Sequence, residues 1–515
     1  MKPIARRVRR TVALISGLAA ASLLLAGCLY SVIPEESPHS TASLAPDTTG
    51  VSGDLLPFYS QKLEWEACHE TFDCATVKAP LDWANPASGD IDLAIIRHRP
   101  AEPIGSLLVN PGGPGVSGVA LIRDSLTFAV GEDLQATYDV VGFDPRGVGA
   151  STSVRCYEAD DMDHYLFDVP RNERGTDAWK QELLDRHARF AAACDENSDG
   201  ILPFITTENA ARDMDLMRAV LGDEKLNYLG YSYGTHLGAV YAGLYPDRVG
   251  RLVLDGAIDP SVSMLEVDLT QGLGFESALR AYMTDCLRSR ECPFRGTLDE
   301  AMSDLAALLA SVDRSPLPAS DGRELGADSL LTAIVVTLYS EESWPSLTIA
   351  LTDALQGNPD TAFQLADFYY DRQDGVYVDS FTEPFRAYNC MDYPVDWTPE
   401  ELAAAQAELD EKSPTIAPYW FGPAPCSVWP HPTSTVRAPI TAEGAAPIVV
   451  VGTTNDPATP YSWAVSLADQ LSSGVLVTRV GEGHTGFNKG NQCVDDAVEA
   501  YMIDGTVPKD GLRCE

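Results

Sequence analysis

Basic residues and long apolar runs are both scarce in this chain. Its 515 residues include 36 Lys and Arg against 75 Asp and Glu, which gives a formal net charge of −39 at pH 7. Binding to nucleic acid depends on basic surfaces that release counterions from phosphates, so we expect no nucleic-acid partner. After the first 30 residues, no run reaches the roughly 18 apolar residues of a membrane-spanning helix, which excludes a multi-pass membrane protein.

Two common zinc-ligand patterns, Cys-x-x-Cys and His-Glu-x-x-His, are absent as well. The sequence therefore gives little support to a metal site, and we expect neither a metal nor an organic cofactor. With 45% hydrophobic and 22% charged residues, the composition is that of an ordinary globular protein. The length suffices for one large core and an additional domain.

The N-terminus has the features of an export signal. Five basic residues lie between Lys2 and Arg10, and the apolar stretch after them is too short for a stable membrane anchor. That stretch ends in Leu25-Ala26-Gly27-Cys28, which resembles the lipobox of bacterial lipoproteins, where the signal is cut before a cysteine that carries the lipid. We expect residues 1–27 to be a signal peptide and Cys28 to be lipid-anchored on the outer face of the cell membrane. A plain secretory signal is the alternative.

Cysteine is plentiful, with 11 residues, which indicates an oxidising compartment. Apart from Cys28, ten cysteines remain, and an even number in an exported chain suggests five disulfides. Their spacing favours sequential pairing, while other connectivities stay open. The five pairs would be Cys68 with Cys74, Cys156 with Cys194, Cys286 with Cys292, Cys390 with Cys426, and Cys493 with Cys514.

Short apolar runs alternate with helical stretches from about residue 61. Runs of strand character lie at residues 91–100, 106–110, 138–144, 226–230, 251–256, 447–452 and 474–481. Strands that alternate with helices predict an α/β fold, in which a mostly parallel sheet is covered by helices.

Two regions depart from this alternation. Residues 28–60 are rich in Ser, Thr and Pro and poor in large apolar residues, so we expect a disordered tether. Between residues 260 and 439 the strand signal disappears, and apolar residues recur at the spacing of amphipathic helices. We expect a helical lid there, inserted into an α/β core made of residues 61–259 and 440–515.

The sharpest chemical signal is Gly230-Tyr231-Ser232-Tyr233-Gly234, which fits the pattern Gly-x-Ser-x-Gly. A predicted strand precedes it and a predicted helix follows it, the setting of a nucleophile elbow. The glycines permit a sharp turn that exposes the Ser232 hydroxyl, and the N-terminus of the helix favours negative charge that develops there. The pattern by itself is weak, and a structural loop is the alternative.

An elbow serine requires an acid and a histidine later in the chain, each after a late strand. Asp456 follows the predicted strand 447–452, and His484 follows the predicted strand 474–481. In this arrangement His484 would take the proton of Ser232 and pass it to the leaving group, while Asp456 would hold the imidazole in the required tautomer. Asp456 could instead be a turn residue before Pro457, but the order and the strand context favour a triad.

A glycine-rich segment, Asn110-Pro111-Gly112-Gly113-Pro114-Gly115, follows the predicted strand 106–110. Glycines let backbone N–H groups approach an oxygen closely, as an oxyanion hole requires. We expect the Gly113 amide to be one donor, with Gly112 as the neighbouring candidate, and the Tyr233 amide to be the other. A loop shaped only for folding is the alternative.

Two other groups near these motifs are interpreted as structural. His236 lies on the helix that leaves the elbow, where packing or capping explains it best. Asp144 and Arg146 follow another strand, and we expect them to form a buried pair that braces the turn.

Together these motifs resemble the prolyl and tripeptidyl aminopeptidases of the α/β-hydrolase family. The resemblance rests on NPGGPG, DPRGVGAS, GYSYG, the late Asp456 and GEGHTG, and covers about residues 60–515. It is closest to the secreted tripeptidyl aminopeptidases of actinobacteria, because proline iminopeptidases usually carry His before Gly-Gly-Pro-Gly. The resemblance implies an α/β-hydrolase fold with a lid that sets specificity, and removal of short peptides from free N-termini.

An aminopeptidase has to bind the α-ammonium group of its substrate, which in a partly dry pocket requires carboxylates or carbonyls. Asp392 and Glu383, near Cys390 in the predicted lid, are candidates. The alternative is that both are solvated surface acids.

The sequence therefore predicts an exported, monomeric serine hydrolase that takes a peptide substrate and contacts the membrane only through its lipid anchor. Two other functions stay open. One is a carboxylesterase or lipase that uses the same triad. The other is a peptide-binding lipoprotein on an inactive hydrolase scaffold.

Overall fold

The computed structural model describes residues 45–515 except 380, 432 and 434. The expected signal peptide, residues 1–27, and the expected lipidation site, Cys28, lie outside the described residues. Within the described part, no helix combines the length and the apolar character needed to cross a membrane.

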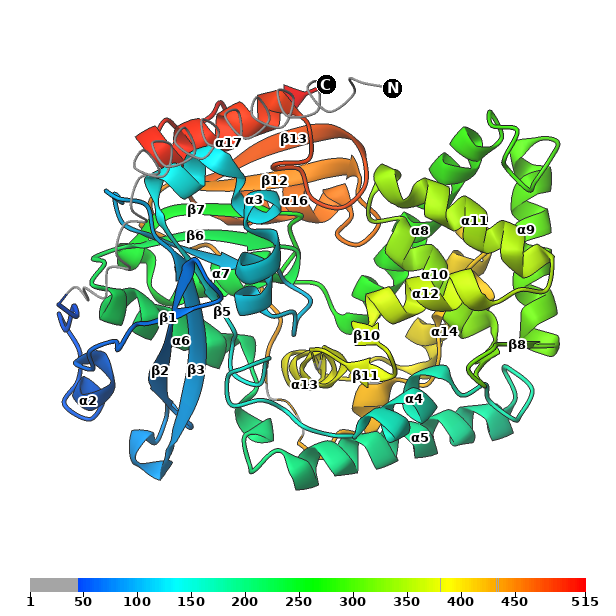
Figure 1. Cartoon of the computed structure of the whole chain (residues 1–515), viewed down its shortest axis with the longest axis horizontal. Helices are drawn as coiled ribbons and strands as arrows, with labels where there is room; N and C mark the ends of the chain where they lie inside the picture. The colour runs from blue at the N-terminus through cyan, green and yellow to red at the C-terminus, as the bar shows by residue number, and fades with distance from the viewer. Residues whose placement is uncertain (1–44, 380, 432, 434) are drawn as a thin grey trace, which may run out of the picture. The chain divides into compact units, whose positions relative to one another are not determined.

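The core is a ten-stranded sheet with the order β1-β2-β3-β5-β4-β6-β7-β12-β13-β14 (Figure 1). The pairs from β1 to β5 are antiparallel, and those from β5 through β14 are parallel. The strands are β1 Glu66–Cys68, β2 Phe72–Pro80, β3 Asp90–His98, β4 Ser106–Asn110, β5 Asp139–Phe143, β6 Leu226–Tyr231, β7 Val249–Asp255, β12 Ile448–Asn455, β13 Gly474–Glu482 and β14 Leu512–Cys514. All seven predicted strands are present, and the prediction of an α/β-hydrolase fold is confirmed.

Helices cover both faces of this sheet (Figure 1). The covering helices are α3 Gly118–Thr137, α6 Thr207–Leu221, α7 Tyr233–Leu244, α16 Tyr461–Gln470 and α17 Gln492–Asp504. Alternate residues of β12 belong to different cores: Val449 and Val451 pack with α3 and α17, whereas Ile448 and Val450 pack with α6, α7 and α16. Because neighbouring side chains of a strand point to opposite faces, a strand buried on both sides is apolar throughout.

Between β7 and β12 the chain is mainly helical. Its helices are α8 Met264–Cys286, α9 Leu298–Arg314, α10 Ala327–Thr337, α11 Trp344–Leu355, α12 Asp360–Tyr369, α13 Thr382–Asp392, α14 Pro399–Lys412 and α15 Ala417–Trp420. Two hairpins of two-residue strands also occur there, β8 Leu317–Pro318 with β9 Glu324–Leu325 and β10 Arg372–Gln373 with β11 Val376–Tyr377. Helices α8 to α12 share a hydrophobic core of their own.

An earlier segment, within the predicted core residues 61–259, packs against the sheet core and also contacts this helical part. It contains α4 Ala159–Phe167 and α5 Asp177–Asn197. The Phe167 ring lies 5.9 Å from that of Phe363. Arg174 forms ion pairs with Asp313 at 3.0 Å and Asp328 at 2.9 Å. This segment therefore bridges the α/β core and the helical part.

The expected tether is too long at its C-terminal end. Residues 45–60 pack against α6, and they include the short helix α2, Leu56–Tyr59. Tyr59 is buried and donates a hydrogen bond to Asp215 at 2.8 Å, while Asp47 pairs with Arg218 at 3.0 Å. Buried apolar contacts and an ion pair thus hold a segment whose overall composition suggested disorder.

The expected Asp144–Arg146 pair is also wrong, although both side chains are buried. Arg146 instead forms a two-pronged ion pair with Asp213 of α6, with both nitrogen–oxygen distances at 2.7 Å. Asp144 accepts hydrogen bonds from the Ser117 hydroxyl and from the Val119 and Ala150 amides. Asp144 and Arg146 therefore bind different partners, at the start of α3 and on α6.

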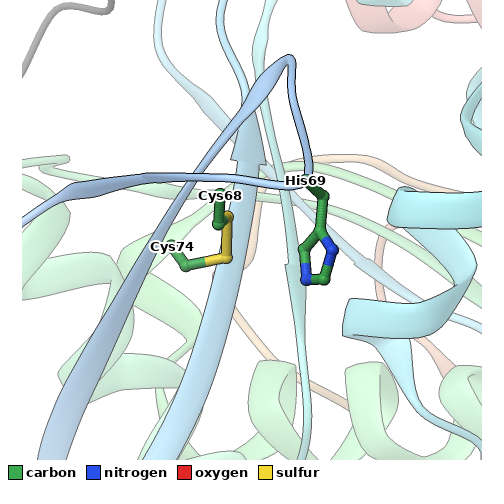
Figure 2. A group of neighbouring side chains, drawn as sticks. All are labelled: Cys68, His69 and Cys74. Atoms are coloured by element: carbon green, nitrogen blue, oxygen red, sulfur yellow. A yellow bond between two sulfur atoms is a disulfide. The ribbon is translucent and has the colours of Figure 1, made fainter.

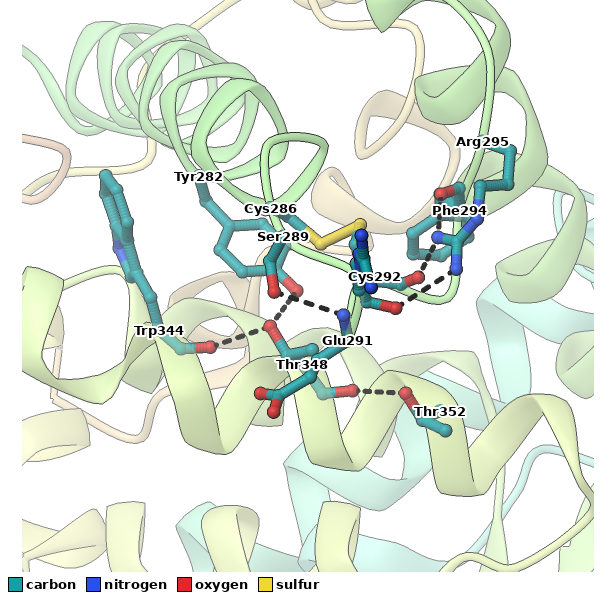
Figure 3. The surroundings of a disulfide bond; sticks show 11 residues. Tyr282, Cys286, Ser289, Glu291, Cys292, Phe294, Arg295, Trp344, Thr348 and Thr352 are labelled. Atoms are coloured by element: carbon teal, nitrogen blue, oxygen red, sulfur yellow. Dashed lines mark hydrogen bonds between the residues drawn. A yellow bond between two sulfur atoms is a disulfide. The ribbon is translucent and has the colours of Figure 1, made fainter.

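All five disulfides of the sequential pairing are present. Figure 3 shows the Cys286–Cys292 bond at the end of α8, where Tyr282 of α8 lies 3.0 Å from the Thr348 hydroxyl of α11. This bond closes the turn that leads from α8 towards α9. Such crosslinks stabilise a fold chiefly by restricting the unfolded chain.

Candidate active site

Ser232 occupies a strained turn between β6 and α7. Its backbone has φ +54° and ψ −121°, a sparsely populated conformation for a residue with a side chain. The turn brings two glycines together, because a methyl group on Gly230 would lie 2.5 Å from the carbonyl oxygen of Gly234. The serine is the N-cap of α7, so its side chain stands at the positive end of that helix.

Asp456 and His484 are in direct contact. His484 Nδ1 lies 2.9 Å from both carboxylate oxygens of Asp456. The buried carboxylate also accepts hydrogen bonds from the Ala458, Thr459 and Thr485 amides. Asp456 follows β12 and His484 follows the adjacent parallel strand β13, so the carboxyl ends of the two strands bring them together.

Asp255, the last residue of β7, connects the serine turn to the histidine loop. Its backbone carbonyl accepts the Ser232 amide at 2.9 Å. Its carboxylate accepts the Gly486 and Phe487 amides, each at 2.8 Å, just after His484. Burial raises the pKa of Asp255 to about 6. The sequence does not reveal this role of Asp255, because nothing in its own segment distinguishes it from any acid that ends a strand.

The glycine-rich segment lies directly against the serine turn. A methyl group on Gly112 would stand 2.9 Å from Ser232 Cβ and 3.0 Å from the Tyr233 amide nitrogen. The Gly112 amide donates to the Asn110 side chain at 3.0 Å. The Gly113 amide has no acceptor among the described residues, and the Tyr233 amide, first in α7, has none within the helix. The Gly113 and Tyr233 amides are therefore uncommitted donors in the two segments that meet at Ser232.

The Tyr233 side chain is hydrogen-bonded to a chain of buried polar groups. Its hydroxyl lies 2.5 Å from the Thr207 hydroxyl, which donates to Asp392 at 2.6 Å. The Asp392 carboxylate is buried, and desolvation raises its pKa to about 6. Glu383 is also buried and accepts the Cys156 amide at 3.2 Å. Neither residue is the solvated surface acid that was the alternative, and their role in binding a substrate ammonium stays a prediction.

Another acid, Asp268 of α8, was not singled out from the sequence. It is half-buried, and burial raises its pKa to about 7, against the opposing effect of Arg386. Within the described chain its carboxylate has no hydrogen-bond partner. One helical turn further on, Gln271 donates to the Ala458 carbonyl at 2.7 Å, so α8 lies across the loop that carries Asp456.

His236 is separate from the Asp456–His484 pair. It is buried, and its Nε2 lies 2.6 Å from the Arg437 guanidinium. Desolvation and Arg437 lower its pKa well below the usual value. A structural role in packing agrees with this environment.

One group of potential metal ligands occurs within the described residues: Cys68, His69 and Cys74 (Figure 2). The two sulfur atoms are bonded to each other, so neither is a thiolate that could bind a metal. This cluster is part of the β1–β2 hairpin.

Comparison with known proteins places this site in a family. Residues 413–514, which contain Asp456 and His484, match the family model described as TAP-like protein. Over 99% of its length the chain is 33% identical to serine protease Hip1 of Mycobacterium tuberculosis, of which the match covers 98%. The chain belongs to the TAP-like family of α/β hydrolases. As a member of the TAP-like family, it is a serine hydrolase.

Two other TAP-like relatives have different names. The chain is 36% identical to Carboxylesterase B of Mycobacterium tuberculosis, over 96% of this chain and 97% of that protein. It is 30% identical to Tripeptidyl aminopeptidase of Streptomyces lividans, over 88% of this chain and 86% of that protein. The family thus includes proteins named for both peptide and ester cleavage.

We expect Asp255→Ala to lower the free energy of unfolding by about 1–3 kcal/mol, because the buried Gly486 and Phe487 amides lose their acceptor. Labelling by a fluorophosphonate probe should also slow, since the histidine loop is no longer tied to the serine turn. Guanidinium unfolding and labelling kinetics measure the two effects.

Asp510→Ala is the matched control, because the exposed Asp510 carboxylate also accepts one backbone amide, that of Leu476. Its effect on stability should stay within about 0.5 kcal/mol. Native stability and native labelling of Asp255→Ala would contradict the bracing role.

Proposed function

We propose that this serine hydrolase is an exported aminopeptidase that releases short peptides from free N-termini, with Ser232, His484 and Asp456 as its catalytic triad. The observation that carries the proposal is the Asp456–His484 hydrogen-bonded pair, tied through Asp255 to a serine in a strained strand–helix turn. The peptide substrate is supported by the relatives named serine protease and tripeptidyl aminopeptidase.

The first step forms an acyl-enzyme. Asp456 accepts a hydrogen bond from His484 Nδ1–H, which keeps the imidazole proton on Nδ1 and leaves Nε2 free to take the Ser232 proton. The serine oxygen attacks the scissile carbonyl, and the tetrahedral intermediate then expels the amine, which receives its proton from His484. A water molecule, activated by the same imidazole, hydrolyses the ester in the second step.

The negative charge of each intermediate develops on the former carbonyl oxygen. The Gly113 and Tyr233 amides are the donors that we assign to it, because both are uncommitted, Tyr233 follows Ser232, and Gly113 follows the glycine that packs against Ser232. Such a donor typically contributes a factor of about 10²–10³ to the rate. The Thr207–Asp392 contacts would keep the Tyr233 backbone in place.

For the substrate α-ammonium we favour Asp268 over Asp392 and Glu383. The Asp392 and Glu383 carboxylates already accept hydrogen bonds from the protein. Asp268 is partly accessible, and its carboxylate has no hydrogen-bond partner in the described part of the chain. A carboxylate in a partly desolvated site attracts an ammonium group more strongly than it does in water.

A carboxylesterase with the same triad is the second candidate, favoured by the 36% identity to a protein of that name. The triad cleaves esters and peptides by the same chemistry, so only tests with both kinds of substrate distinguish an esterase from a peptidase. Turnover of nitrophenyl acyl esters without any release of tripeptidyl arylamides would favour the esterase.

We further propose that the protein is exported, cleaved after residue 27 and lipidated at Cys28. The five disulfides support an oxidising compartment. Mass spectrometry of the mature N-terminal peptide should find a cysteine that carries acyl chains. A peptide that begins elsewhere, or an unmodified Cys28, would leave a plain secretory signal.

Ser232→Ala and His484→Ala should each lower hydrolysis and fluorophosphonate labelling by at least about 10³-fold with the fold intact, because the nucleophile or its base is lost. Ser60→Ala, at an exposed serine, is the control and should label like the native protein. Activity, labelling and circular dichroism are measured together. Full activity of Ser232→Ala would overturn the proposed mechanism.

Asp268→Asn should raise KM for a tripeptidyl arylamide with a free N-terminus by about tenfold, because the charge that pairs with the ammonium is lost. Since burial raises the pKa of Asp268 to about 7, the native acid is protonated below that pH. Native KM should therefore rise as the pH falls from 8 to 6, and the variant should lack this rise.

Glu266→Gln, at an exposed acid of the same helix, is the control and should keep the native KM and pH profile. The N-acetylated form of the arylamide should be a poor substrate for all three proteins. An unchanged KM and pH profile in Asp268→Asn would remove this residue from the ammonium site.

A further inference from the structure

A cavity of about 680 Å³ lies beside His484, on the side of the β13 loop. Its lining includes His484, Pro111 of the glycine-rich segment and Tyr339. It also includes Phe128 of α3, whose side chain is 61% exposed, and half-buried Lys489. The cavity therefore reaches from the imidazole to the solvent-exposed surface. Asp268 and Arg386 do not line it.

The position of the His484 imidazole indicates which part of the substrate would occupy this cavity. In the proposed mechanism His484 delivers its proton to the departing amine, so the segment after the scissile bond has to leave beside that ring. An enzyme that cleaves near a free N-terminus also needs an open path there, because the departing chain is of any length. The cavity satisfies both conditions, since it adjoins His484 and opens to solvent.

Lys489 is one of two basic residues that line this cavity in the described chain, together with Arg479, and the acidic residues Glu341, Glu342 and Glu482 line it as well. Its Nζ lies 3.2 Å from the centre of the Phe128 ring, a cation–π contact. Within the described chain no carboxylate lies within ion-pair distance of it. Burial lowers its pKa to about 8, against the opposing charges of Asp255, Glu342 and Asp495. The other basic lining residue, Arg479, donates to the Glu482 carbonyl at 2.8 Å through one of its guanidinium nitrogens.

We infer that this cavity binds the first residues of the departing segment, and that Lys489, held on the Phe128 ring, binds a carboxylate of that segment. The inference rests on the proposed function. The carboxylate has two possible sources, an acidic side chain within the first residues after the scissile bond or the C-terminus of a short substrate. A carboxylate is preferred because Phe128 supplies no counter-charge and leaves the ammonium protons available.

The test uses peptides with one fixed N-terminal tripeptide and three further residues. In one set, Glu or Gln stands at the first, second or third position after the scissile bond, and the C-terminus is amidated. A second set has only alanines there, with the C-terminus free or amidated. The same tripeptide on an arylamine provides a small, uncharged leaving group. Values of kcat/KM are measured for the native enzyme, Lys489→Met and Lys489→Arg.

For the native enzyme we expect kcat/KM to be about five- to tenfold higher for the Glu peptide than for the Gln peptide at one position or more. Alternatively, kcat/KM should be higher by a similar factor for the alanine peptide with a free C-terminus than for its amidated form. Lys489→Met should reduce that ratio to about one, and Lys489→Arg should keep most of it. The set that shows the ratio identifies the source of the carboxylate.

The inference would be overturned if the native enzyme hydrolysed the charged and uncharged peptides of each pair with equal kcat/KM. It would also be overturned if Lys489→Met lowered kcat/KM equally for every substrate, including the arylamide. The arylamide separates this failure from that of the proposed function. If the native enzyme hydrolyses the arylamide but shows no carboxylate preference, only the role of Lys489 is lost. If it hydrolyses no substrate with a free N-terminus, the aminopeptidase proposal itself fails.

Discussion

Asp255 holds the two halves of the candidate active site in one place through both its backbone and its side chain. The Ser232 amide bonds to its carbonyl, and the amides that follow His484 bond to its carboxylate. These partners are more than 200 positions apart in sequence, and they meet because β6, β7, β12 and β13 are adjacent parallel strands. A buried carboxylate that accepts several amides fixes the loops more firmly than a neutral acceptor would, because charge-assisted hydrogen bonds are the stronger ones.

The helical part between β7 and β12 belongs to the site as much as the sheet does. The Tyr339 carbonyl accepts the His484 amide at 2.8 Å, and the two rings meet edge to face at 5.2 Å. The glycine-rich segment is covered by α13, since a methyl group on Gly115 would stand 2.9 Å from the Phe385 amide nitrogen. The helical part therefore packs directly against the loops that carry the catalytic candidates. On our proposals, the N-terminal end of the substrate meets α8, and the departing end passes along Phe128 and Lys489.

Several elements escaped prediction for identifiable reasons. The edge strands β1 and β14, and β2 next to β1, carry exposed and charged residues, so they lack the continuous apolar run that marks the central strands. Nothing in the sequence of α4 shows that its last residue, Phe167, meets Phe363 of the helical part. Residues 45–60 have the composition of a tether, yet Tyr59 and Asp47 find buried partners on α6.

The sequence alone determined the strand ends at which Ser232, Asp456 and His484 stand, because apolar runs, glycine turns and chain order are local properties. It also favoured the five sequential disulfides, since neighbouring cysteines close the shortest loops. Only the tertiary structure revealed the Asp255 brace, the uncommitted Asp268 and the contact of Lys489 with Phe128. Each of these depends on which distant segments the packed helices and strands bring together, and on how much water they exclude there.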